Sequence, residues 1–170
     1  MTKEEKELVL KDLSARLRYG VKVDLFGQSK ELIGVLNDIL SVGYDINDYE
    51  DAPIEDIKPY LRPLSSMMQG EWEEMTALIY PYGRVNLNNK NELLLWLSVE
   101  GNDMPIILMD NVFSWLNEHK FDYRGLIEKG LALEAPEGMY DVYVDLADGK
   151  DKTVETTYDG NGNIVKQEIK

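Results

Sequence analysis

The clearest strand pattern of this chain lies in residues 20–44, GVKVDLFGQSKELIGVLNDILSVGY. Apolar and polar residues alternate over 21–25, and further β-branched and aliphatic residues occupy 32–42. Residues 27–29 predict a first turn. Asn37-Asp38 predicts a second, because these residue types tolerate the left-handed backbone of a tight hairpin. The stretch therefore predicts two or three short antiparallel strands.

An amphipathic helix is expected before these strands, from about Thr2 to Tyr19. Thr2 and Glu5 have the spacing of a capping box, in which each residue satisfies a backbone N–H near the other. Three leucines at spacings of three and four residues share one face, which predicts packing against a sheet. Gly20 supplies a left-handed stop at the end of the helix.

Two more helices and two more strands are expected later in the chain. Ser66 and Gln69 have a second capping-box spacing that predicts a helix through Ile79, and another helix is expected over 105–119. The segments 85–87 and 93–99 are typical of strands. Because the second of these is apolar on both faces, it predicts the centre of the sheet.

An acidic, proline-containing loop is expected at 45–56. An ordered connector is expected at 57–64, because its two prolines withhold the backbone donors that a long helix or a central strand needs. Near the end of the chain, alternating residues flank the turn Asp159–Asn163 and predict a β-hairpin. We therefore expect an α+β fold: a single domain at residues 1–140, with an antiparallel or mixed sheet packed by about three helices, and a C-terminal β-hairpin extension at 141–170.

The chain has one histidine and no cysteine, so it lacks most of the side chains from which catalytic and metal-binding sites are usually built. His119 is expected at a helix end, where it interacts with the negative end of the helix dipole. No phosphate-binding or dinucleotide-binding glycine motif occurs, and neither acidic segment, at 45–56 or 159–170, matches the calcium-loop pattern. We expect no cofactor, no metal and no catalytic residues. A carboxylate-based hydrolase is kept as an alternative, because paired acids alone can hydrolyse glycosides.

Charge limits the kinds of partner that the chain can bind. The formal net charge of -14 repels phosphate backbones and anionic lipids, so neither direct nucleic-acid binding nor membrane binding is expected. The first seven residues are charged, and no run approaches the roughly 20 apolar residues of a membrane span. We expect a cytoplasmic protein.

Half of the net charge lies between Tyr44 and Met75, where nine acidic residues face two basic ones and tyrosines and a tryptophan are interleaved. One interpretation is simple solubility. Our main hypothesis is instead a non-enzymatic interaction module whose acidic, aromatic surface binds a basic host protein. An alternative is a nucleic-acid mimic that inhibits a host DNA-binding or defence protein. The candidate surface comprises Asp45, Asp48, Tyr49, Glu50, Asp51, Glu55, Asp56, Tyr60, Glu71, Trp72 and Glu74.

Four segments also carry a family resemblance: LSARLRYGVKV at 13–23, IKPYLRPLSSM at 57–67, FDYRGLIEKGLA at 121–132 and APEGMY at 135–140. Together they resemble a family of uncharacterised proteins encoded by gut Bacteroidales and their phages or mobile elements. The resemblance implies a bacterial, cytoplasmic setting with a phage connection. It supplies no activity, substrate or catalytic residue.

Overall fold

The computed structural model describes residues 1–45, 47–80, 83–87, 93–97, 106–140, 154–158 and 164–169. The helices in this part are α1 (Lys3–Arg16), α2 (Gln69–Ala77) and α3 (Ile106–Glu118). The strands are β1 (Lys22–Leu25), β2 (Gln28–Leu36), β3 (Ile39–Asp45), β4 (Asp48–Pro53), β5 (Ile57–Leu61), β6 (Gly83–Leu87), β7 (Leu93–Leu97), β8 (Leu133–Glu134), β9 (Val154–Tyr158) and β10 (Ile164–Ile169). A six-stranded sheet has the order β4-β3-β2-β1-β5-β8, in which only the β5–β8 pair is parallel. The predicted α+β fold with three helices and a mixed sheet is therefore confirmed.

Helix α1 begins and ends near the positions that the sequence predicts. The Thr2 hydroxyl accepts a hydrogen bond from Glu5 N, and the Glu5 carboxylate accepts one from Thr2 N, which completes the capping box. A 3-10 turn, Leu17–Tyr19, follows the helix and ends at Gly20, whose φ is +64°. Val9 and Leu13 of α1 are fully buried against the sheet.

Strands β1, β2 and β3 form an antiparallel meander with close turns. The second turn lies at Asn37-Asp38 as predicted, and Asn37 has a φ of +53°. The first turn lies at Phe26-Gly27, so the predicted turn at 27–29 was placed too late. At the other end of β3, Gly43 leaves room for β4, because a Cβ atom on it would lie 2.2 Å from the carbonyl oxygen of Asp48.

The prediction of an irregular acidic loop at 45–56 is wrong, because Asp48–Pro53 forms strand β4 and Ile54–Asp56 forms a 3-10 turn. Ala52 of β4 and Ile54 of the turn are buried in the core, and this burial stabilises the ordered segment despite its acidic composition. Within the described residues β3 is the only strand that pairs with β4, which makes β4 one edge of the sheet.

The prediction that 57–64 is a connector without a central strand is wrong, because Ile57–Leu61 forms strand β5 between β1 and β8. Pro59 is tolerated there because β8 pairs only with Tyr60 and Leu61, so that Pro59 lies where β5 is still the outer strand. The segment leaves the sheet at Arg62 and continues into the 3-10 turn Leu64–Ser66.

Two further expectations on the second half of the chain are corrected. Helix α2 begins after Met68, whose backbone N–H donates to Glu71 Oε2, whereas the Ser66 hydroxyl donates to Pro63 O. Strand β7 is not the centre of the main sheet, since it pairs with β6 in a separate two-stranded sheet. Helix α3 matches its prediction within a residue at each end.

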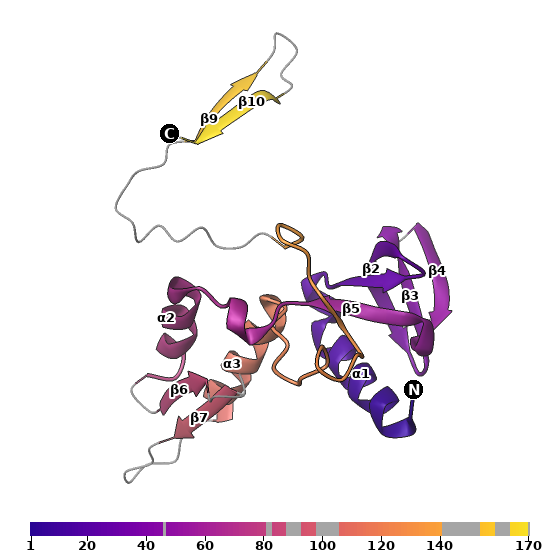
Figure 1. The fold of residues 1–170 in the computed structure, drawn as a ribbon, viewed down its shortest axis with the longest axis horizontal. Coiled ribbons are helices and arrows are strands. Elements are labelled where there is room, and N and C mark those ends of the chain that lie inside the picture. The colour runs from indigo at the N-terminus through magenta and orange to yellow at the C-terminus, as the bar shows by residue number, and fades with distance from the viewer. Residues whose placement is uncertain are drawn as a thin grey trace.

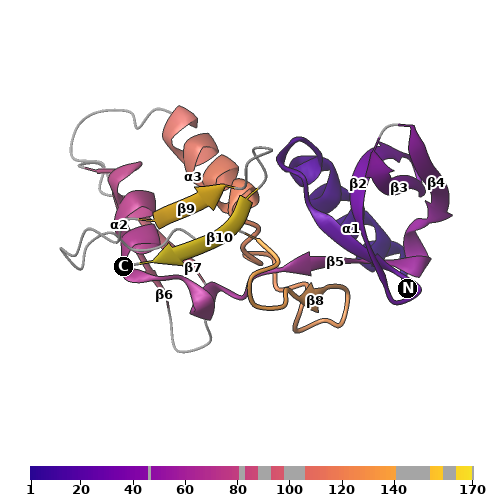
Figure 2. The ribbon, with the colours of Figure 1, turned by 90° about the horizontal axis from the view of Figure 1, so that it is seen from above.

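The buried apolar side chains form two cores, and the elements that build them lie side by side (Figures 1 and 2). The first core packs α1 against the β1–β5 sheet, and the second gathers side chains from α2, α3 and the 3-10 turn at Leu64. Strand β5 runs from the first core toward the second, and the segment 121–140 returns between them. Phe121 is buried in the second core, while Leu126 and Leu131 are buried in the first.

At the C-terminal end, β9 and β10 pair antiparallel and form a two-stranded sheet of their own. The turn predicted at Asp159–Asn163 lies outside the described residues.

Candidate functional site

Four consecutive residues of the predicted acidic surface lie on β4, the edge strand of the sheet. Asp48, Tyr49, Glu50 and Asp51 follow one another on β4 and are all exposed, with 53% of Tyr49 accessible. Tyr44, at the end of β3, is 68% exposed near the same end of the strand pair. The side chain of Asp45 lies outside the described part. Edge β4 thus presents acidic and tyrosine side chains beside an open strand backbone.

Some of these carboxylates are bound by basic or hydroxyl side chains of neighbouring elements. Lys30 forms an ion pair with Glu50, and Ser41 Oγ donates to Asp51 Oδ1 at 2.6 Å. On the 3-10 turn that follows β4, Glu55 pairs with Lys6 Nζ at 2.6 Å, and this hydrogen bond lowers the pKa of the Glu55 carboxyl. Asp56 is exposed on the same turn.

The rest of the predicted surface does not join edge β4. Tyr60 is half-buried on β5 and donates to Asp24 Oδ1 at 3.0 Å; burial, followed by this contact, raises its pKa. Trp72 and Glu74 lie on α2 in the second core region, with Trp72 partly buried and Glu74 exposed. The eleven residues therefore do not form one surface.

Glu71 is the clearest correction, because only 2% of it is exposed. Its carboxylate accepts two hydrogen bonds from Arg62, at 2.7 and 2.9 Å, and one from Met68 N at 2.9 Å. Burial alone would raise the pKa of Glu71, but the Arg62 and Met68 hydrogen bonds outweigh it and lower the pKa. A buried carboxylate needs such a partner, so Glu71 serves the fold rather than a partner surface.

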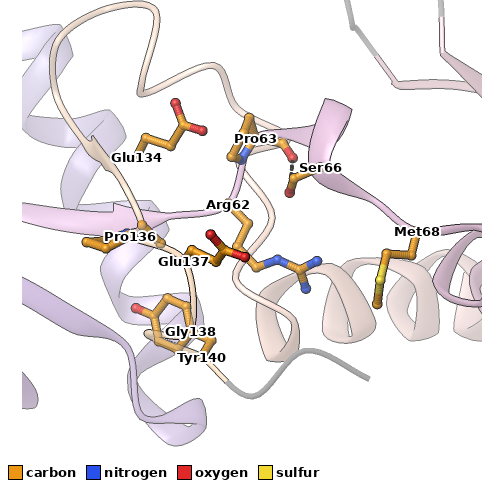
Figure 3. Close-up of a pocket in the computed structure, with 10 residues that line it drawn as sticks. Arg62, Pro63, Ser66, Met68, Glu134, Pro136, Glu137, Gly138 and Tyr140 are labelled. Carbon is orange, nitrogen blue, oxygen red and sulfur yellow. Dashed lines mark hydrogen bonds between the residues drawn. The ribbon is translucent and has the colours of Figure 1, made fainter. Parts of the chain in front are cut away.

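A pocket of about 270 Å³ that the sequence does not predict lies where β5 and β8 end (Figure 3). Because these strands are parallel, the residues that follow each of them emerge at the same end of the sheet. Arg62, Pro63, Ser66 and Met68 line one side, and residues 134–138 and Tyr140 line the other. The sequence would predict this pocket only if it predicted the pairing of β5 with β8. The two residues of β8 are too few to give a recognisable strand pattern.

The polar groups of this pocket are mostly engaged. The Tyr140 hydroxyl donates to Tyr60 O and accepts from Lys22 N, both at 2.9 Å, and burial raises the pKa of Tyr140 to about 12. The Ser66 hydroxyl donates to Pro63 O at 2.8 Å. Glu134 and Glu137 are the two carboxylates that line the pocket, and both side chains are exposed.

His119 does not line this pocket, and its ring contacts Trp115 of α3. Its Nδ1 is 2.9 Å from Trp115 O, and its ring stacks on the Trp115 ring with centroids 4.0 Å apart. Among the residues that the structure describes, no group of three or more histidine, cysteine or acidic residues is arranged to hold a metal ion.

No protein family, curated protein or solved structure matches this chain. None of the helices in the described ranges is long and apolar enough to cross a membrane.

Proposed function

We propose that the protein is a non-enzymatic interaction module that binds a basic, extended segment of another protein at edge β4. The observation that carries the proposal is an open sheet edge whose four consecutive residues from Asp48 to Asp51 are three acids and a tyrosine, all exposed. On this proposal the protein works in the cytoplasm of a bacterium, in line with the family resemblance.

Backbone chemistry supports strand addition at this edge. An edge strand leaves a row of N–H and C=O groups without sheet partners, and an extended peptide can pair with them. Side chains of the added strand would then alternate between the two faces, opposite those of β4. Tyr49 offers an amphipathic ring at this position, which suits a protein interface.

Charge defines the class of the partner segment. Acidic side chains disfavour the addition of an acidic strand or of a second copy of β4, because like charges directly opposite one another repel. Lysine or arginine residues at alternate positions would instead oppose the carboxylates. The same charges would steer a basic partner toward the edge and make its binding sensitive to salt.

Selection of peptides displayed on phage tests this proposal. The immobilised protein is compared with an edge variant, Asp48→Asn/Glu50→Gln/Asp51→Asn, and with a control variant, Glu73→Gln/Glu74→Gln/Glu118→Gln, which removes equal charge from exposed helix positions. We expect peptides with alternating basic residues that bind wild type and control, bind the edge variant less, and dissociate between about 0.05 and 0.5 M NaCl.

Two results would contradict strand addition at β4. One is a set of selected peptides that bind the edge variant as well as wild type, and the other is amide chemical-shift changes confined to residues outside β3 and β4. Competition with duplex DNA for a basic partner addresses the mimic alternative: displacement by DNA would favour mimicry, whereas its failure would leave a protein-specific interface.

A further inference from the structure

The pocket at the ends of β5 and β8 is independent of edge β4. In the sheet order, β4 and β8 are the two outermost strands, so the pocket and the acidic edge lie at opposite ends of the sheet. Figure 3 shows Pro63, Ser66 and Met68 on one side of the pocket and Glu134, Pro136 and Glu137 on the other. A ligand of this pocket would therefore be recognised by different residues.

Two carboxylates give the pocket its charge. Glu134 and Glu137 line it, and neither forms an ion pair or a side-chain hydrogen bond with any residue in the described part of the chain. Among the described residues of the lining Arg62 is the only basic one, and its guanidinium is already bonded to the Glu71 carboxylate at 2.7 and 2.9 Å. The net charge of the lining side chains with this buried partner included is therefore negative.

Two lysines contact Tyr140 or its neighbour Met139, but neither lines the pocket. Lys22 Nζ donates to Met139 O at 3.3 Å, and Lys120 Nζ lies 5.1 Å from the centre of the Tyr140 ring. Burial, the largest of several influences, lowers the pKa of Lys120.

The remaining lining favours an apolar stem. Pro63, Pro136 and Met68 present carbon and sulfur surface, and the hydroxyl groups of Ser66 and Tyr140 are bonded to backbone groups of the protein. A ligand that combines an aliphatic chain with a positive end would bury its chain against these residues and direct the charge toward the two glutamates.

We propose that this pocket binds a primary ammonium group on an aliphatic stem, as found in a lysine side chain or a free alkyl diamine. An ammonium carries three donors that can reach two separate carboxylates, whereas the planar fork of a guanidinium matches a single carboxylate. The volume of about 270 Å³ suits one such chain and lies just below the range of pockets for larger ligands.

Amide chemical-shift titration of the full chain tests the proposal. The probes are Nα-acetyl-lysine-N-methylamide, its norleucine counterpart without the ammonium, and 1,5-diaminopentane, each added to about 10 mM. We expect the two cationic probes to shift the amides of Ala135, Glu137 and Gly138, and norleucine to leave them unchanged. Tighter binding of the lysine probe would indicate a peptide side chain as the natural source, and tighter binding of the diamine a free amine.

A double variant, Glu134→Gln/Glu137→Gln, is expected to weaken binding of the cationic probes about three- to tenfold, because each exposed charge pair contributes modestly. Glu118→Gln/Glu128→Gln removes the same charge from exposed positions outside the pocket and should bind as wild type does. Equal binding of norleucine, no shift at residues 135–138, or unchanged affinity in the pocket variant would overturn the proposal. None of these results depends on edge β4.

Discussion

At the scale of single residues, the most unusual feature is a buried cluster of three charges. Asp12 and Arg16 of α1 are both fully buried, and Arg16 donates to the Asp12 carboxylate at 2.7 and 3.0 Å. Arg124 donates to the same carboxylate at 2.7 Å, and Arg16 also donates to Phe121 O at 2.9 Å. Asp12 is therefore the only acid that balances two arginines in this cluster, which ties α1 to the segment after α3.

Asp12→Ala should destabilise the protein by about 3 to 5 kcal/mol, because it leaves Arg16 buried without its counter-ion. The free energy of unfolding is measured by urea titration. Glu7→Ala is the control on the same helix, since its pair with Lys3 is exposed and 3.8 Å long, and it should change stability little. Similar losses in the two variants would show that the buried cluster contributes nothing beyond helix propensity.

The hydroxyl of Tyr140 predicts how the stability of the protein changes in alkaline solution. Its hydroxyl bridges Lys22 N and Tyr60 O, and its pKa of about 12 exceeds the ordinary value of 10. The unfolded chain therefore releases this proton first, so stability should fall as pH rises from 10 toward 12. Tyr140→Phe should lose about 1 to 3 kcal/mol at neutral pH by leaving two backbone groups unpaired.

The measurement is the urea midpoint of both proteins between neutral pH and pH 11. We expect the decline above pH 10 to be shallower in Tyr140→Phe than in wild type. Tyr80→Phe is the control, since Tyr80 is 77% exposed, and it should retain the wild-type slope. A Tyr140→Phe slope equal to that of wild type would contradict the raised pKa.

At the scale of elements, the Arg62–Glu71 pair joins the end of β5 to the first turn of α2. The Arg62 guanidinium also lies 4.2 Å from the centre of the Phe121 ring, so it contacts a third segment. Because the pKa of Glu71 is lowered, the pair contributes its full stabilisation above the unfolded-state pKa of about 4.3. That contribution is lost as the pH falls from there through the lowered pKa of the folded protein.

Glu71→Gln should be less stable than wild type at pH 7, since Arg62 keeps a buried charge without a counter-ion. It should also lose less stability than wild type between pH 5 and pH 3, because the titrating group is gone. Urea midpoints across this pH range check both expectations. Glu74→Gln, exposed on the same helix, should follow the wild-type pH profile; a parallel profile for Glu71→Gln would contradict the prediction.

Sequence patterns predicted the elements whose signals are local. The Thr2–Glu5 capping box, Gly20 and the Asn37-Asp38 turn each act within a few residues, and the structure has all of them. Strand β4 was missed because its acids suggest a loop, whereas burial of Ala52 and pairing with β3 determine its conformation. Glu71 was wrongly predicted to be exposed, because its partner Arg62 lies on another element and no local pattern links the two residues.

At the scale of the whole molecule, the two cores share parts of the chain. The backbone of Arg62 bonds to both sides of Phe121, through Lys120 O at 2.8 Å and Asp122 N at 2.7 Å. Phe121 then packs in the second core, and Leu126 packs in the first. Unfolding of either core would expose residues of the shared segment, so we expect the two cores to unfold together.

Arg62→Ala should uncouple the cores, because it removes both the partner of Glu71 and the cation above the Phe121 ring. All three tryptophans, Trp72, Trp96 and Trp115, follow β5 in the sequence, so their fluorescence reports on the later elements. Hydrogen exchange of β1–β3 peptides reports on the first core. The control variant is Lys58→Ala, at an exposed position of β5. In wild type and in this control, the urea transitions followed by fluorescence and by hydrogen exchange should coincide. In Arg62→Ala fluorescence should change at lower urea than exchange, and coincident transitions there would mean that the cores are coupled by other contacts.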